Sequence, residues 1–425
     1  MKNMSLYKAF FVIAILSFIC FVLLYFTEQK GLTGPFLIIG FIGLAIAARG
    51  SSRFKGFSYS LLILTAVTVS MYYPKYFLGV GDFQFKLLIV PLLQIIMFGM
   101  GSQMSLKDFA GVVKMPKGVI VGVICQFTIM PIMGITVARM FNFPPEIAAG
   151  IVLVGSSPSG MASNVMSFIA KANLALSVTL TAFATLLSPL VTPLLMKVFA
   201  GELIEINFWN MMVGIFNMVI LPICAGLIFN LFLNKLQSKK NTITQIVSYL
   251  SIMFLKNFIA FQTTEMEMST FFSNLAFDIA IFALLPILGV YIFKYFAKGD
   301  KELLDKLLSF ISMLGIGIII TVITAAGRDS LLDVGFLLIL ACLIHNMFGY
   351  SLGYGVSKLL RMNEQDCRTI ALEVGMQNGG LASGLALQMG KVATVGLAPA
   401  IFGPMMNITG SSLASWWRGK EKALK

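Results

Sequence analysis

The chain has 425 residues, of which 58% are hydrophobic and only 12% are charged, and its formal net charge is +13. A soluble globular protein has about 25% charged residues, so this composition excludes a soluble fold and indicates an integral membrane protein. Apolar runs of about 20 residues are typical of transmembrane helices, and the lack of alternating ten-residue segments argues against an outer-membrane barrel.

Fourteen apolar segments follow one another along the chain and are predicted as membrane helices. They lie near residues 6–26, 34–48, 57–73, 87–104, 117–140, 147–170, 174–196, 208–233, 246–263, 273–293, 307–326, 334–357, 369–389 and 393–416. With the N-terminus inside, 23 of the 31 Lys and Arg residues fall on the inner side and 7 on the outer side. The positive-inside rule therefore favours a fold with both termini in the cytoplasm, and it explains the net charge without a nucleic-acid partner.

Two simpler features limit the kind of site that the chain can build. The five cysteines are scattered and odd in number, which is typical of small apolar side chains within helices rather than of disulfides or metal sites. A single histidine excludes a site that needs a histidine cluster. The first segment has too long an apolar run, and no small-residue cleavage site, for a secretory signal. We expect no organic cofactor.

An internal repeat links the sixth and thirteenth segments. Residues 154–164 (VGSSPSGMASN) are similar to residues 374–384 (VGMQNGGLASG) at an offset of 220. The two copies are seven helices apart, so they run in opposite directions through the membrane. Helix-breaking residues lie in both copies: Pro158, Gly160, Gly375, Gly379 and Gly380. Two interrupted helices in inverted repeats are the plan of many secondary transporters, although glycine can also serve simple helix packing.

Polar residues gather around the two breaks. Glu373 lies within the second copy, and a carboxylate in the bilayer is costly enough to indicate a function. It is followed by Gln377 and Asn378. Other oxygen-bearing side chains lie near the breaks or in neighbouring segments: Gln126, Ser163, Asn164, Ser177 and Thr181. A set of oxygen ligands with one carboxylate suits a monovalent cation.

Four further polar residues lie within the apolar segments. Asp278 and Lys256 are at similar depth if segments nine and ten form a hairpin, so we expect an ion pair, with a lone snorkelling lysine as the alternative. Asn346 is placed like Gln126 and is expected to face a cavity. His345 is expected to form a hydrogen bond between helices.

These motifs resemble the bile acid:sodium symporter family. The matching stretches are residues 98–106 (FGMGSQMSL), 125–131 (CQFTIMP), 160–193 and 373–383 (EVGMQNGGLAS). The resemblance spans about residues 57–233 and 304–416. It implies two inverted five-helix repeats, arranged as a panel domain and a core domain whose broken helices cross, and inward transport of an organic anion with two sodium ions.

The resemblance also divides the chain into parts. These are an extra N-terminal helix pair (1–56), inverted repeat 1 (57–199), the first helix of repeat 2 (208–233), an inserted helix pair (240–300), the remainder of repeat 2 (304–416) and a basic cytoplasmic tail (417–425). The expected fold class is an all-α polytopic membrane protein of about fourteen helices.

Carried over to this sequence, the family's motifs imply two sodium sites and a substrate site. The first sodium site would use Ser163, Asn164, Ser177, Thr181 and Glu373. The second would use Gln126, Glu373, the backbone carbonyls of Val374 and Met376, and Gln377. The substrate site would include Asn378, Met161 and Asn346. Met161 replaces a Thr of bile-acid-transporting relatives, which argues against a bile-acid substrate.

The sequence thus predicts a secondary active transporter in the plasma membrane rather than an enzyme. We expect it to import a small organic anion, such as a carboxylate of the pantoate or ketopantoate type or a bile-acid-like anion, together with two Na⁺. A proton-coupled or efflux transporter of organic acids is one alternative, and a non-transporting membrane sensor or assembly protein is another. The expected partners are the substrate and the lipid bilayer, and the oligomeric state is open.

Overall fold

The computed structural model describes residues 2–27, 33–51, 54–105, 111–233, 239–264 and 266–423. Within these residues the fold is almost entirely helical, and nine helices are long and apolar enough to cross a membrane, with three shorter apolar helices beside them. A two-residue hairpin of β1 (Gly79–Val80) and β2 (Phe83–Gln84) pairs antiparallel in a loop. The protein is therefore an all-α polytopic membrane protein, as expected.

The helices of the first half begin and end close to the apolar segments of the sequence. They are α1 (Lys2–Phe26), α2 (Thr33–Arg49), α3 (Ser58–Tyr72), α4 (Ile89–Gln103), α6 (Pro116–Met140), α7 (Pro145–Ser156), α8 (Ala162–Ile169) and α9 (Leu174–Ala200). Short 3-10 turns lie at Lys55–Phe57, Pro74–Phe77 and Phe85–Leu88.

The second half has two helices that contain a π-helical turn. Its helices are α10 (Phe208–Ile215), α11 (Leu221–Leu233), α12 (Lys239–Thr263), α13 (Met268–Ile279), α14 (Leu285–Ala297), α15 (Lys301–Ala326), α16 (Arg328–Leu359), α17 (Glu364–Gly375), α18 (Gly379–Gln388) and α19 (Leu397–Ala423). The π turns, Phe216–Ile220 and Ala280–Leu284, join α10 to α11 and α13 to α14.

The helices pack into two layers. In the panel layer, α4 packs against α11 and α15, and α3 packs against α15. In the core layer, α6 and α16 pack against each other, and α7, α8, α9, α17, α18 and α19 surround them. Backbones touch directly between α4 and α11, because a Cβ on Gly226 would lie 2.3 Å from the carbonyl oxygen of Phe98. Long apolar helices bury their mutual faces in this way and leave the rest for lipid.

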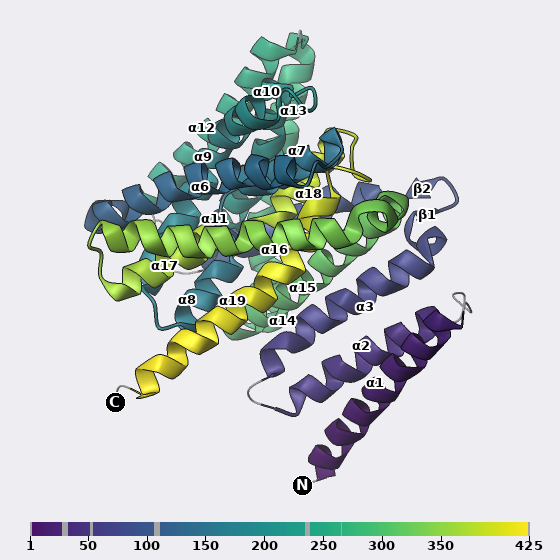
Figure 1. Cartoon of the computed structure of the whole chain (residues 1–425). Helices are drawn as coiled ribbons and strands as arrows, with labels where there is room; N and C mark the ends of the chain where they lie inside the picture. The colour runs from purple at the N-terminus through teal and green to yellow at the C-terminus, as the bar shows by residue number, and fades with distance from the viewer. Residues whose placement is uncertain are drawn as a thin grey trace.

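The two helix pairs that the family resemblance left over lie beside the panel layer. Helix α1 packs on α2 and α2 on α3, whereas α12 and α14 pack on α11. Figure 1 shows α1, α2 and α3 side by side at one edge of the molecule and α12 and α13 far from them. Both pairs therefore extend the panel layer rather than covering the crossing region of the core layer.

The hairpin of α12 and α13 contains the expected ion pair. The ammonium of Lys256 lies 2.7 Å from Oδ2 of Asp278, and each side chain is 6% exposed. The side-chain amide of Asn257 donates to the same carboxylate over 2.6 Å. The ion-pair prediction is confirmed, and the alternative of a lone snorkelling lysine is wrong, because two opposite charges at the same depth compensate each other.

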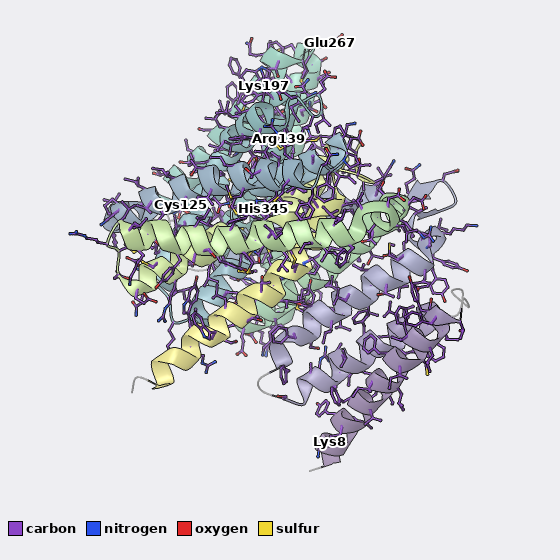
Figure 2. The ribbon with its side chains drawn as sticks, in the orientation of Figure 1. Lys8, Cys125, Arg139, Lys197, Glu267 and His345 are labelled. Atoms are coloured by element: carbon purple, nitrogen blue, oxygen red, sulfur yellow. The ribbon has the colours of Figure 1, made fainter. Side chains whose placement is uncertain are left out.

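The cysteines and the histidine also match their expected surroundings. All five cysteines are free, and four of them are buried. Nε2 of His345 on α16 lies 2.8 Å from the carbonyl oxygen of Met130 on α6, so the ring bridges two core helices. Figure 2 shows His345 in the interior of the helical assembly, and Cys125 on the neighbouring α6.

Candidate ion and substrate sites

Two interrupted helices cross in the core layer. Helix α7 ends at Ser156 before α8 begins at Ala162, and α17 ends at Gly375 before α18 begins at Gly379. We call residues 157–161 and 376–378 the first and second linker. The amide of Gly160 donates to the carbonyl of Met376 over 2.9 Å, and the amide of Asn378 donates to the carbonyl of Pro158 over 2.8 Å. The linkers thus pair antiparallel through their backbones.

The close approach of the linkers depends on glycine and proline. A Cβ on Gly160 would lie 2.8 Å from the carbonyl oxygen of Gln377, which is too close for any larger residue without a backbone shift. Pro158 has no amide hydrogen, so it leaves no buried donor unpaired while its carbonyl accepts from the second linker. The residues that break the helices in the sequence are therefore the ones that permit the crossing.

Side chains from other helices satisfy the ends of the broken helices. The hydroxyl of Thr192 on α9 donates to the carbonyl of Ser156 over 2.8 Å, and the amide of Asn346 on α16 donates to the carbonyl of Gly375 over 2.8 Å. The side chain of Asn378 accepts from the amide of Leu381 and caps α18. These bonds supply partners for backbone groups that a helix end leaves without any.

The position of Asn346 corrects one expectation. We expected Asn346 to face the cavity, but it is fully buried. Its side-chain oxygen, Oδ1, accepts from the hydroxyl of Thr409 over 2.7 Å. The reason is that the carbonyl end of α17 is buried and needs a donor, which Asn346 supplies. Asn346 is accordingly absent from the cavity described below.

The residues expected at the first sodium site do come together, around the carboxylate of Glu373. The hydroxyls of Ser163 and Ser177 donate to its Oε1 over 2.6 and 2.5 Å, and the hydroxyl of Thr181 donates to its Oε2 over 2.9 Å. The side-chain oxygen of Asn164 lies 2.8 Å from the same Ser177 hydroxyl oxygen. We call these five residues the Glu373 cluster. It contains six side-chain oxygen atoms from α8, α9 and α17.

The Glu373 cluster contains a single carboxyl group, which is negatively charged when ionised. Glu373 is 2% exposed, and no ion pair within the described ranges involves it. Burying an ionised carboxylate costs more free energy than its hydrogen bonds to neutral hydroxyl groups recover. A cation or a proton must therefore compensate the charge. The oxygen-only donor set fits a hard monovalent cation.

The residues expected at the second sodium site form a separate chain of amide contacts. Nε2 of Gln126 donates to the carbonyl of Ser157 over 2.9 Å and to Oε1 of Gln377 over 2.7 Å. Nε2 of Gln377 donates to the carbonyl of Val374 over 2.6 Å. Oε1 of Gln126 is buried and has no donor among the described atoms. The carbonyl of Met376 is engaged by the crossing itself.

Glu373, which was expected to serve both sites, makes no described hydrogen bond to Gln126 or Gln377. The second group nevertheless brings four oxygens together: Oε1 of Gln377, the carbonyls of Ser157 and Val374, and the unpartnered oxygen of Gln126. Three of these oxygens now accept from side-chain amides. A cation could take the place of those amide hydrogens, since all four oxygens are neutral ligands.

A cavity of about 350 Å³ lies between the crossing and the panel layer. Met161, Gly160, Asn378, Gly379 and Gly380 line it from the two linkers and the first turns of α8 and α18. The remaining walls come from α4, α15 and α19, and none of the described residues that line the cavity is charged. Pro158 and Gly375 do not line it. Its polar surface is therefore supplied by amides, hydroxyls and the N-terminal ends of two half-helices.

Several residues of the site gave no clear signal in the sequence. Thr192 donates directly to the end of α7, and Thr409 supports the end of α17 through Asn346. Each of them is one of many threonines in apolar segments, so the sequence does not single it out. Gln388 at the end of α18 donates to the carbonyl of Asn210 on α10 over 2.6 Å and so links the core layer to α10. A polar residue paired across a long sequence separation is visible only in three dimensions.

Comparisons with known proteins show the family to which the chain is related. Residues 90–267 match the model of the Sodium Bile acid symporter family, a range that includes α12, which the motifs had left outside the resemblance. The chain is 33% identical to the uncharacterized sodium-dependent transporter YocS of Bacillus subtilis over 375 residues, which cover 88% of this chain and 95% of the relative. It is 29% identical to the probable sodium/metabolite cotransporter BASS1 of Arabidopsis thaliana chloroplasts over 326 residues, 77% of this chain and 65% of that protein.

The helical membrane fold and these relatives together define a membrane protein of the sodium-dependent transporter class, and the relatives are named as transporters rather than enzymes. The chain belongs to the sodium bile acid symporter family. The family expected from the sequence motifs is thereby confirmed.

Proposed function

We propose that the protein imports a small organic anion together with two sodium ions, and that the first ion binds in the Glu373 cluster. The buried carboxylate with three hydroxyl groups directed at it carries this proposal. A sodium ion would replace the three hydroxyl hydrogens as the positive partner of Glu373, while the hydroxyl oxygens turn toward the ion. Burial then favours binding, because the empty charged site is the costly state.

The second ion in this proposal binds beside Gln126 and Gln377. The unpartnered Oε1 of Gln126 supports it, because a buried oxygen without a donor is uncommon and rotation of the amide would turn that oxygen toward the neighbouring carbonyls. Gln377 belongs to the second linker and lines the cavity, so an ion that holds Gln377 also holds the substrate surface. Sodium occupancy is thereby coupled to the shape of the substrate cavity.

The proposed substrate site is the cavity beside the crossing. An anion there would meet the first turns of α8 and α18, where the helix dipoles place partial positive charge. The side chain of Asn378 lies at the same surface. With no charged side chain among the described residues of its lining, the cavity suits a monocarboxylate with an apolar body better than a di- or tricarboxylate. Pantoate-like acids fit this description, and Met161 makes the lining less polar than a Thr would.

Charge balance favours the inward direction. Two sodium ions with one monovalent anion carry one net positive charge, to which an inside-negative potential of 100 mV contributes about 2.3 kcal/mol. The cell's plasma membrane supplies such a potential. The same carboxylate could instead bind a proton, so proton coupling and efflux remain the alternatives to be tested.

The inverted-repeat architecture is part of the proposal, with fourteen membrane segments and both termini inside. Equivalent helices of the two halves make equivalent contacts: α6 packs on α7 and α9, as α16 packs on α17 and α19, and α4 packs on α11 as α15 packs on α3. The paired linkers support the same two-fold relation. This relation assigns residues 57–199 to one repeat and residues 208–233 with 304–416 to the other. It leaves 1–56 and 240–300 as additional helix pairs.

The proposed orientation places the mouth of the cavity on the cytoplasmic side. Gln103 at the end of α4 and Ser309 near the start of α15 line it, and both lie toward the inner ends of their helices under the positive-inside assignment. At the opposite end, Gln388 contacts α10, and a Cβ on Gly214 would lie 1.8 Å from its side-chain oxygen. Alternating access would require this contact to open.

Uptake into proteoliposomes tests the proposal, with sodium and pH varied independently and candidate carboxylates offered one at a time. We expect uptake that requires sodium outside, and its loss in Ser163→Ala. Ser167→Ala is the matched control, because Ser167 lies one turn further along α8 and its hydroxyl has no partner among the described residues. Uptake that follows a pH gradient and ignores sodium would reject sodium coupling.

A further inference from the structure

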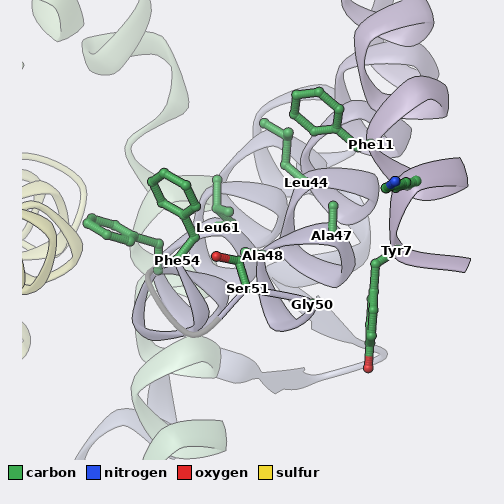
Figure 3. A pocket seen from close by; sticks show the side chains of 11 residues that line it. Tyr7, Phe11, Leu44, Ala47, Ala48, Gly50, Ser51, Phe54 and Leu61 are labelled. Atoms are coloured by element: carbon green, nitrogen blue, oxygen red, sulfur yellow. The ribbon is translucent and has the colours of Figure 1, made fainter. Parts of the chain in front are cut away.

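The first three helices enclose a hollow that the transport site does not use. Helices α1, α2 and α3 form a layer beside the panel, and at one end of this layer a cavity of about 440 Å³ opens between them. Figure 3 shows this hollow, with Tyr7 and Phe11 on α1, Leu44 and Ala47 on α2, and Leu61 on α3 around it. Its volume is typical of a ligand pocket rather than of a packing defect.

Small residues create the space. A Cβ on Gly43 would lie 3.0 Å from the Cβ of Ala14, so α1 and α2 are in close contact midway along their length. Toward Gly50 the aromatic ring of Tyr7 lies directly against the glycine and forms the contact between α1 and the end of α2. Ala47 and Ala48 are too short to fill the resulting gap, so it stays open.

The lining combines apolar walls with a single charge. Lys8 is the only charged residue among the eleven that line the hollow, and it is exposed. It forms no ion pair within the described part of the chain. In the sequence, residues 1–27 and 33–57 contain five basic residues and no acidic ones. Four of them lie in described elements at this end: Lys2 and Lys8 on α1, Arg49 on α2 and Lys55 in the turn before α3. The mouth of the hollow is therefore positive while its interior is apolar.

We infer that this hollow binds one anionic phospholipid, with its phosphate beside Lys8 and an acyl chain against Phe11, Leu44 and Leu61. A phospholipid is the occupant that has both an anionic head and an apolar body, and it reaches the site from the bilayer, to which most of α1 is exposed. A soluble anion would leave the apolar walls unused. A second copy of the chain would have to insert a protruding side chain into a concave space between three helices.

Native mass spectrometry of the purified protein tests the inference, with phosphatidylglycerol and phosphatidylcholine as the probes. We expect the wild-type protein to retain one phosphatidylglycerol in preference to phosphatidylcholine. Lys8→Gln should weaken this retention about fivefold, which is the usual contribution of one basic residue at a membrane surface. Ala47→Phe should abolish it by filling the hollow. Lys301→Gln, which removes an exposed lysine at the start of α15, should leave it unchanged.

Equal retention of the two lipids, or the same phosphatidylglycerol retention in Lys8→Gln and Ala47→Phe as in the wild type, would overturn the inference. A dimer that Ala47→Phe converts to a monomer would also overturn it, in favour of a second copy as the occupant. Gel filtration and the melting temperature check that each variant is folded. Transport is not the readout, so the outcome does not depend on the proposed sodium coupling.

Discussion

The substitution Glu373→Gln separates the role of the carboxylate charge from that of its shape. Oε1 of the glutamine can still accept from Ser163 and Ser177, and its Nε2 can donate to the hydroxyl oxygen of Thr181, which donates to Oε2 in the wild type. We therefore expect a folded protein whose stability in potassium falls by no more than about 1–3 kcal/mol, the cost of one unsatisfied buried group. Its sodium affinity should change far more, since removing one charge of a buried pair costs about 3–5 kcal/mol, or roughly two to four orders of magnitude.

Thermal unfolding of purified protein in sodium and in potassium measures this difference. At a sodium concentration of about 100 times Kd, the wild-type protein gains about 2.7 kcal/mol of stability. A Kd raised 100-fold reduces this gain to about 0.4 kcal/mol at the same concentration. Sodium should therefore raise the melting temperature of the wild type clearly and that of Glu373→Gln hardly at all.

Glu364→Gln is the matched control, because Glu364 lies on the same helix but is partly exposed and pairs with Arg368. It should keep the sodium-dependent shift in melting temperature. If Glu373→Gln kept that shift in full, the ion would bind elsewhere and the assignment of the Glu373 cluster would be refuted. A shift that appears on acidification instead of on sodium addition would favour proton coupling.

Three further substitutions test the crossing, the closed end of the cavity and the buried ion pair. Gly160→Ala places a methyl group 2.8 Å from a backbone carbonyl of the other linker, so unfolding should become easier by about 1–3 kcal/mol and uptake should fall. Gly214→Leu occupies the space of the Gln388 side chain, so a cysteine in the cavity lining should become reactive to a membrane-impermeant maleimide added outside. Lys256→Met leaves Asp278 without its cation and should lower stability by about 3–5 kcal/mol in thermal unfolding.

Each of these substitutions has its own check. Gly403→Ala also lies at the cavity, but its Cβ would meet nothing within 4 Å, so it should be harmless. Unchanged outside labelling in Gly214→Leu would mean that the contact with α10 does not close the cavity. Adding Asp278→Leu to Lys256→Met should restore stability, and an additive further loss would show that the two charges do not compensate each other.

The sequence by itself determined the class of protein, the family and the residues of the Glu373 cluster. Long apolar segments can be recognised as membrane helices from the sequence, because a helix that crosses a bilayer needs about 20 apolar residues. Glu373 can be recognised as a functional residue from the sequence, because the free-energy cost of a carboxylate within a membrane segment indicates a function. The breaks at Pro158 and Gly375 follow from local backbone chemistry, which needs no knowledge of neighbouring helices.

Only the tertiary structure decided which partners those residues meet. Asn346 could have faced the cavity as readily as the carbonyl end of α17, and the choice depended on the helix packed against it. The carboxylate of Glu373 met the hydroxyls of α8 and α9 and not the amides of Gln126 and Gln377. The hollow at Lys8 had no sequence signal at all, because it results from the spacing of three helices and not from any one of them.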